Sequence, residues 1–141
     1  MKTLTVINRK WILLALLIAL IILSYLLTTD YRDYIYKNGI NDFGLADVGY
    51  NIFAVTTLSL SSWIGLFKIT DNKIIGIAVI TAGYLLLEVL SGILPFIGTY
   101  DTMDLLALLF SGGITIMLLF LIDSEAFRSD FSDVRTYFGG K

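Results

Sequence analysis

The sequence contains no cysteine and no histidine, and only 16% of its 141 residues are charged. Without cysteine there is no disulfide framework, no thiol nucleophile and no thiolate metal site. Without histidine there is no imidazole base, no Ser-His-Asp or Cys-His arrangement, and no usual zinc or haem ligand. The formal net charge of -2 offers no basic surface for nucleic acid. Carboxylates, hydroxyls, lysines and arginines are the reactive groups that remain.

Apolar residues, in contrast, make up 57% of the chain, and the mean hydropathy is +0.82. A soluble domain carries about 25% charged residues, so this composition indicates a membrane protein. Four apolar stretches are long enough to cross a hydrocarbon core about 30 Å thick. They cover residues 11–27, 48–67, 74–93 and 105–122. The sequence therefore predicts an all-α membrane protein, with a four-helix transmembrane bundle over residues 1–122.

The first stretch is expected to be an uncleaved anchor, because it is longer than the core of about 7 to 15 residues in a signal peptide. The segment after it, Thr28–Asp47, is predicted to be an outer loop with a turn at Asn38-Gly39. In this loop, one short helical turn with Tyr31, Tyr34 and Ile35 is expected on the bilayer surface. Lys68–Lys73 is expected to be a tight inner loop.

The second outer loop, Leu94–Met103, is opened by Pro95, which cannot continue a helix. Residues 123–141 are predicted to form a short amphipathic C-terminal helix, which ends at Gly139-Gly140. Its apolar stripe has spacings of four, three and four residues and consists of Phe127, Phe131, Val134 and Phe138. We expect this tail to lie on the cytoplasmic leaflet of the bilayer.

Lysine and arginine are distributed unevenly over the two sides of the predicted bundle. Eight of the ten lie on the side that holds both termini: Lys2, Arg9, Lys10, Lys68, Lys73, Arg128, Arg135 and Lys141. Only Arg32 and Lys37 lie on the opposite side. The positive-inside rule then places both termini in the cytoplasm and the chain in the cytoplasmic (plasma) membrane as a multi-pass protein.

Glu88 is the most informative position, since it lies inside the third apolar stretch. A charged side chain near a helix centre costs about 2.5 to 3.5 kcal/mol on insertion scales. We therefore expect Glu88 to face the bundle interior, on a helical face that also carries Thr81, Tyr84 and Ser91. The alternative is that this stripe consists of interhelical hydrogen bonds that only hold helices together.

Other acids fall in the outer third of the predicted bundle together with Glu88. Asp47 and Asn51 lie near the outer end of the second stretch, and Asp101 and Asp104 precede the fourth. Acids at a helix start also have a purely structural explanation, since they complement the helix dipole. The predicted polar site comprises Glu88, Asp101, Asp104, Asp47, Asn51, Ser91 and Tyr84.

Small residues in the third and fourth stretches favour close helix approach. They are Ala78, Ala82 and Gly83 in one stretch and Ser111, Gly112 and Gly113 in the other. The sequence has no glycine-rich phosphate loop, no metal-ligand spacing and no nucleophile-base pair. We therefore expect no cofactor, no metal site and no catalytic residue.

The run from Glu88 to Gly113, EVLSGILPFIGTYDTMDLLALLFSGG, resembles the second half of the VanZ-like family. These are small polytopic membrane proteins named for a teicoplanin-resistance protein. The resemblance extends from Asp47 to Leu118 and rests on the order of Glu88, Asp101 and Asp104. This chain departs from the family pattern at several positions. Ser91 stands where glutamine is usual, Gly98 or Thr99 where arginine is usual, Leu108 where asparagine is usual, and Asn51 where histidine is frequent.

The resemblance implies a role at the cell envelope and reduced susceptibility to lipoglycopeptide antibiotics. The leading hypothesis is a non-enzymatic membrane protein whose outer acidic site contacts a lipid or a cell-wall precursor headgroup. Two alternatives are a proton- or cation-coupled carrier subunit, in which Glu88 titrates, and an enzyme acting on a lipid-linked envelope precursor. The fourth hypothesis is a scaffold subunit. The expected partner is the lipid bilayer, and whether the chain forms a homo-oligomer stays open.

Overall fold

The computed structural model describes residues 6–94 and 100–139, and the regular secondary structure in these ranges is helical. Helices account for 83% of the described residues, and no strand occurs among them, which confirms the all-α prediction. The described residues include three helical segments that are long and apolar enough to cross a membrane: Arg9–Asn38, Lys73–Ser91 and Thr102–Ile122. The protein is therefore a membrane protein by the length and composition of these helices.

The first of these segments begins as α1 (Val6–Leu26), continues through the π-helical turn η1 (Leu27–Tyr31) and ends as α2 (Arg32–Asn38). The prediction of an outer loop from residue 28 onward is therefore wrong as far as residue 38. The Thr28 hydroxyl donates to the Ser24 carbonyl at 2.8 Å, and the Thr29 hydroxyl donates to the Tyr25 carbonyl at 2.7 Å. These hydrogen bonds lie where the apolar run ends, and the helical backbone continues beyond them.

Gly39 ends α2 as its C-cap in the left-handed region, at φ 59°, so the predicted Asn38-Gly39 turn is confirmed. Ile35 is buried, at 6% exposure, although the sequence suggested a place on the bilayer surface. The chain then enters the short helix α3 (Leu45–Val48) and the helix α4 (Asn51–Ile64). Gly65, at φ 92°, ends α4 three residues before the predicted boundary at Phe67.

Helix α5 (Lys73–Ser91) and helix α6 (Thr102–Ile122) form a hairpin whose connection includes residues 95–99. Pro95, Gly98 and Thr99 lie outside the described residues. Asn72 caps α5 by accepting from the Ile75 amide, and Asp101 caps α6 by accepting from the Met103 amide. The predicted boundaries of these two helices differ from the observed ones by at most three residues.

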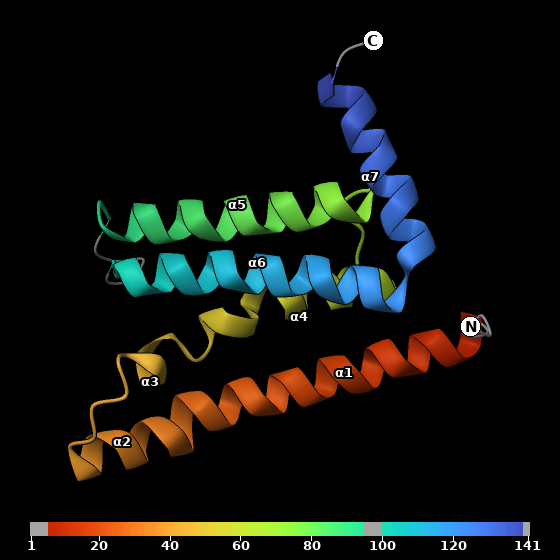
Figure 1. Cartoon of the computed structure of the whole chain (residues 1–141). Coiled ribbons are helices and arrows are strands. Elements are labelled where there is room, and N and C mark those ends of the chain that lie inside the picture. Colours follow the sequence, from red (N-terminus) through yellow and green to blue (C-terminus); the bar gives the residue numbers. More distant parts are fainter. Residues whose placement is uncertain (1–5, 95–99, 140–141) are drawn as a thin grey trace.

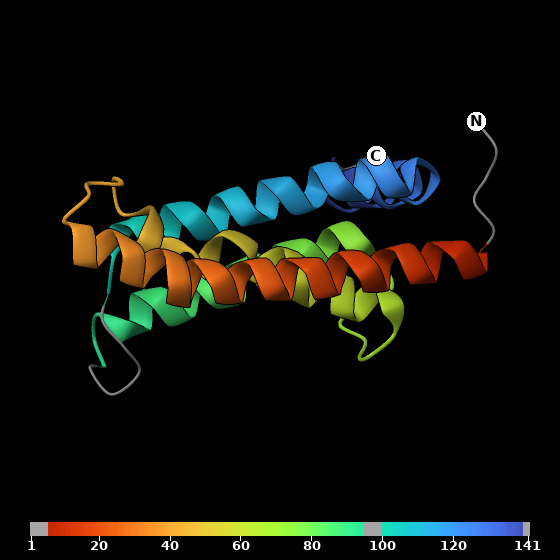
Figure 2. The same cartoon turned by 90° about the horizontal axis from the view of Figure 1, so that it is seen from below.

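Helix α4 occupies the centre of the arrangement, because it packs against α1, α5 and α6. Figure 1 shows α5 and α6 side by side with α7 leaving at their right-hand end, and in Figure 2 α1 runs lengthwise across the other helices. The core has two clusters, one around Val55, Ile77 and Leu108, and one around Leu13 and Leu60. Large apolar side chains on the outer faces remain exposed, as expected for helices surrounded by lipid.

A polar seam holds α4 to α6 inside this core. The Ser111 hydroxyl accepts from the Val55 amide at 3.2 Å, and the hydroxyls of Thr56 and Thr115 lie 2.8 Å apart. All of these side chains are fully buried. Hydrogen bonds between membrane helices contribute about 0.6 kcal/mol each, so the seam fixes the register of the two helices more than it stabilises them.

The C-terminal helix α7 (Ser124–Gly139) confirms the predicted helical tail. Phe127 packs against the core, with its ring centroid 5.4 Å from that of Phe120. Asp130 ties α7 to the start of α5, because its carboxylate accepts from the Lys73 amide at 2.9 Å. Phe131 and Phe138 are exposed, so the outer part of the apolar stripe faces away from the bundle.

Candidate functional site

The predicted acids gather at one end of the molecule, where α5 ends, α6 begins and α3 lies nearby, at the left of Figure 1. Glu88 stands one helical turn before the end of α5, because the helix stops at Ser91 rather than at residue 93. Its Oε1 accepts a hydrogen bond from the Asp101 amide at 2.8 Å. The carboxylate of Glu88 thus connects the end of α5 to the beginning of α6.

Asp101 has a structural role at the same place. Its Oδ1 accepts from the Met103 amide at 2.9 Å, which satisfies one of the free amides in the first turn of α6. A carboxylate here also complements the positive end of the helix dipole. Glu88 and Asp101 are therefore held in fixed positions by backbone amides, each with one carboxylate oxygen engaged in these bonds.

Asp104, in the first turn of α6, is half-buried. Its Oδ1 is buried and has no hydrogen-bond partner among the described residues. The Asn51 side chain lies within hydrogen-bonding reach of the Asp104 carboxylate, and the charges of Glu88, Asp101 and Asp47 are close enough to act on it. A buried carboxylate oxygen without a partner is costly and calls for an explanation such as an ion or a ligand donor.

Asp47 belongs to this acidic end but already has partners of its own. Its Oδ1 lies 3.2 Å from the Arg32 guanidinium and accepts from the Tyr36 hydroxyl at 2.6 Å. The Arg32 guanidinium also lies over the Tyr36 ring, 5.6 Å from its centroid. These contacts join α2 to α3, and Arg32 balances the charge of Asp47. Arg32 is not paired with Glu88, Asp101 or Asp104 among the described residues.

Ser91 and Tyr84 do not join the acidic group. The Ser91 hydroxyl is buried and donates to the Glu88 carbonyl at 2.6 Å, so it helps to end α5. Tyr84 lies beside Tyr50 and lines a groove of about 440 Å³ between α1, α4 and α5. The predicted stripe from Thr81 to Ser91 is thus divided between several environments.

Sequence reasoning missed the groove that contains Tyr84. Seven of its ten lining residues carry hydroxyls: Ser24, Tyr25, Thr28, Tyr50, Thr57, Ser61 and Tyr84. The signal that could have found it is the spacing of four between Ser24 and Thr28 on one helix, and between Thr57 and Ser61 on another. The partners of Asp47 were also missed, since no local pattern links residues 32, 36 and 47.

The described residues contain no group of three or more acidic, histidine or cysteine side chains arranged to hold a metal ion. The carboxylates of the acidic end are near enough to repel one another, yet they do not converge as a ligand set. Comparison with family models, curated proteins and solved structures finds no match to this chain. The role of the acidic end therefore has to be inferred from its geometry and from the order of its acids along the chain.

Proposed function

We propose that the chain crosses the cytoplasmic membrane four times, with α3 and α4 together as the additional crossing. The backbone of Gly49 and Tyr50, between these helices, stays in the right-handed helical region. Helix α4 alone, with 14 residues at about 1.5 Å each, reaches about 21 Å, and α3 with the two-residue turn at Gly49 and Tyr50 supplies further length toward the 30 Å of the hydrocarbon core. The central position of α4 among α1, α5 and α6 supports this crossing.

The orientation of this bundle follows from its lysines and arginines, most of which lie at the end where α1 begins and α6 ends. Reporter domains fused after Lys141 and inserted after Lys68 are expected to be cytoplasmic. A reporter inserted at Asn38 is expected to be external. The location of each site is measured with two reporters, one active only in the cytoplasm and one active only outside. Activity of the cytoplasmic reporter at Asn38 would contradict the orientation.

We further propose that the acidic end binds a cationic or hydrogen-bond-donating headgroup of an envelope lipid or cell-wall precursor. The observation that carries this proposal is the buried, unpartnered Asp104 Oδ1, flanked by the carboxylates of Glu88 and Asp101. An ammonium or amide donor placed here would both satisfy the oxygen and reduce the repulsion between carboxylates. The resemblance to the VanZ-like family supports a role at the cell envelope, with lower susceptibility to lipoglycopeptide antibiotics.

The first test is antibiotic susceptibility in a Gram-positive host that expresses wild-type protein or Asp104→Asn. A hydrogen bond to a charged group contributes about 1.5–3 kcal/mol, so its loss weakens binding about ten- to a hundred-fold. We expect wild-type protein to lower teicoplanin susceptibility and Asp104→Asn to return it to the level of empty vector. Vancomycin is measured in parallel.

The matched control is Asp33→Asn on α2, whose exposed carboxylate pairs with Lys37 and lies outside the acidic group. Equal amounts of each variant in the membrane fraction are required. A resistant strain that keeps its resistance with Asp104→Asn and with Glu88→Gln would contradict the acidic-site proposal.

The unpartnered oxygen of Asp104 also supports a second candidate, a proton- or cation-coupled carrier. This candidate requires pH- or cation-dependent flux into vesicles that contain the purified protein. Flux that is unaltered by Asp104→Asn would remove the carrier, whereas absence of flux with altered antibiotic susceptibility would favour headgroup binding.

A further inference from the structure

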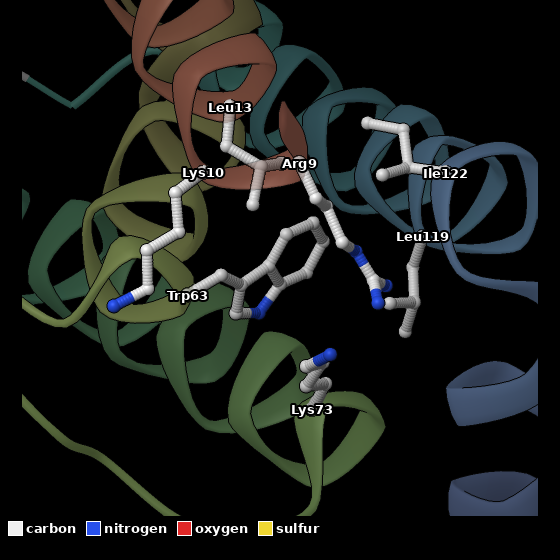
Figure 3. Close-up of a pocket in the computed structure, with 7 residues that line it drawn as sticks. All are labelled: Arg9, Lys10, Leu13, Trp63, Lys73, Leu119 and Ile122. Carbon is white, nitrogen blue, oxygen red and sulfur yellow. The ribbon is translucent and has the colours of Figure 1, made fainter. Parts of the chain in front are cut away.

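A pocket of about 170 Å³ lies at the opposite end of the bundle from the acidic group. Its polar lining consists of Arg9 and Lys10 from α1, Trp63 from α4 and Lys73 from α5. The rest of the lining is aliphatic and comes from α1 and α6. In Figure 3 the Arg9 guanidinium and the Lys73 ammonium lie on the same side of the Trp63 ring, and Lys10 extends along the other side.

The charges around this pocket do not cancel. Asp123 accepts from the Lys73 ammonium at 2.8 Å and also pairs with Arg9. The Asp130 carboxylate also lies here, on the Lys73 amide, so two carboxylates lie near the three cations Arg9, Lys73 and Lys10. Arg9 and Lys73 are each about 30% exposed, so both can still be reached from outside. The pocket has a net positive potential and presents several hydrogen-bond donors.

The depth of the pocket matches the boundary between hydrocarbon and water. Lys73 is the first residue of α5, and Ile122 is the last residue of α6. Arg9 and Lys10 directly precede the apolar run of α1. Tryptophan is enriched at this level of a bilayer because its ring is amphipathic. In a bilayer that α1, α5 and α6 cross, these three cations would stand at the level of the lipid phosphates.

An apolar groove adjoins the pocket and shares Lys10 with it. The groove has a volume of about 370 Å³ and is otherwise lined by Trp11, Leu14, Ile64 and Leu66. Its lining is almost entirely apolar and comes from the beginning of α1 and the end of α4. A cationic pocket with an apolar groove beside it suits a ligand that has an anionic head and a hydrocarbon chain.

We propose that this pocket binds the phosphodiester of an anionic phospholipid, with an acyl chain in the adjoining groove. Arg9, Lys73 and the Trp63 indole contact the phosphate, and Lys10 stands between phosphate and chain. The bound lipid holds together the inner ends of α1, α4 and α5. This inference needs only a membrane-embedded chain and is independent of the ligand at the acidic end.

The test uses Trp63 as its own reporter. The sequence has two tryptophans, so Trp11→Phe leaves Trp63 alone and keeps the groove apolar. The purified full chain is reconstituted in phosphatidylcholine vesicles that contain a matched series of mole fractions of brominated phosphatidylglycerol or of brominated phosphatidylcholine. We expect brominated phosphatidylglycerol to quench the Trp63 fluorescence at lower mole fractions than brominated phosphatidylcholine. Each lysine or arginine near an anionic bilayer surface changes such a preference about fivefold.

Lys10→Gln and Lys73→Gln are therefore each expected to lower the preference for phosphatidylglycerol about fivefold. The matched control is Lys68→Gln, because Lys68 lies at the same end, is exposed and pairs with Asp71. Equal quenching by the two lipids, or a preference that both pocket variants retain, would overturn the proposal. Inorganic phosphate that displaces the lipid at millimolar concentration would assign the pocket to a soluble phosphate compound instead.

Discussion

Gly112→Ala is expected to destabilise the contact between α5 and α6. An alanine Cβ at this position would lie 2.9 Å from Thr81 Oγ1 and 3.4 Å from Thr81 Cγ2. Thr81 cannot turn away freely, because its hydroxyl donates to the Ile77 carbonyl at 2.8 Å. Overpacking of this kind costs about 1–3 kcal/mol. Thermal unfolding of the purified protein in detergent, followed by circular dichroism, measures the loss.

The neighbouring glycine is the matched control, since a Cβ at Gly113 would meet nothing within 4 Å. Gly113→Ala should leave the stability unchanged or raise it slightly, because alanine favours helix more than glycine does. Thr81→Ala should rescue Gly112→Ala, since the remaining Thr81 Cβ is 3.8 Å away, an ordinary contact. Additive losses in the double variant would show that Gly112 acts through something other than this contact.

The two glycines also show how far a sequence can predict helix packing. Small residues in both stretches predicted close approach, and Gly112 provides it. Gly83, in the facing helix, has open space where its Cβ would be, and Ala82 is exposed. Which small residue lies in the contact depends on the rotation of each helix about its axis. That rotation is set by the whole packed arrangement and has no local signal.

The segment after Leu27 shows a different limit of sequence reasoning. Hydropathy falls at Thr28 and Asp30, so the prediction placed a loop there, and the helix nevertheless continues to Asn38. Hydropathy records which residues tolerate lipid, whereas helical backbone can extend past the bilayer with polar residues on it. The turn at Gly39 was predictable because the residue after a helix often adopts the left-handed conformation, which favours glycine.

At the acidic end, the sequence shows the residue types and their order along the chain. It does not show their hydrogen-bond and ion-pair partners. Asp104 was expected among acids and lies among them. The pairing of Asp47 with Arg32 and Tyr36 depends on the position of α2 beside α3. Asp123 meets cations that lie at residues 9 and 73, far away in sequence. Contacts of this kind follow from the fold and leave no spacing pattern.

Removing the charge of Asp123 is expected to lower the stability strongly, because this single carboxylate joins α1, α5 and the start of α7. Burial by itself would raise the pKa of Asp123, but hydrogen bonds from Lys73, from the Ala126 amide and from Arg9 outweigh burial and hold it below its ordinary value. Asp123→Asn keeps the shape and removes the charge. Loss of one hydrogen bond between charged groups costs about 1.5–3 kcal/mol, so the variant should unfold at a clearly lower temperature at neutral pH.

The pH dependence of the stability difference shows whether Asp123→Asn acts through the lost charge or through altered side-chain geometry. Because the pKa of Asp123 is lower in the folded state, its contribution is fully present above the unfolded value of about 3.9 and is lost as the pH falls through the folded value. The difference in stability between wild type and Asp123→Asn should therefore be constant above about pH 5 and shrink below about pH 4. Asp133→Asn, an exposed change on the same helix α7, should show little difference at neutral pH. A difference for Asp123→Asn that persists undiminished at pH 3 would mean that the amide disturbs this junction by its geometry and not by the loss of charge.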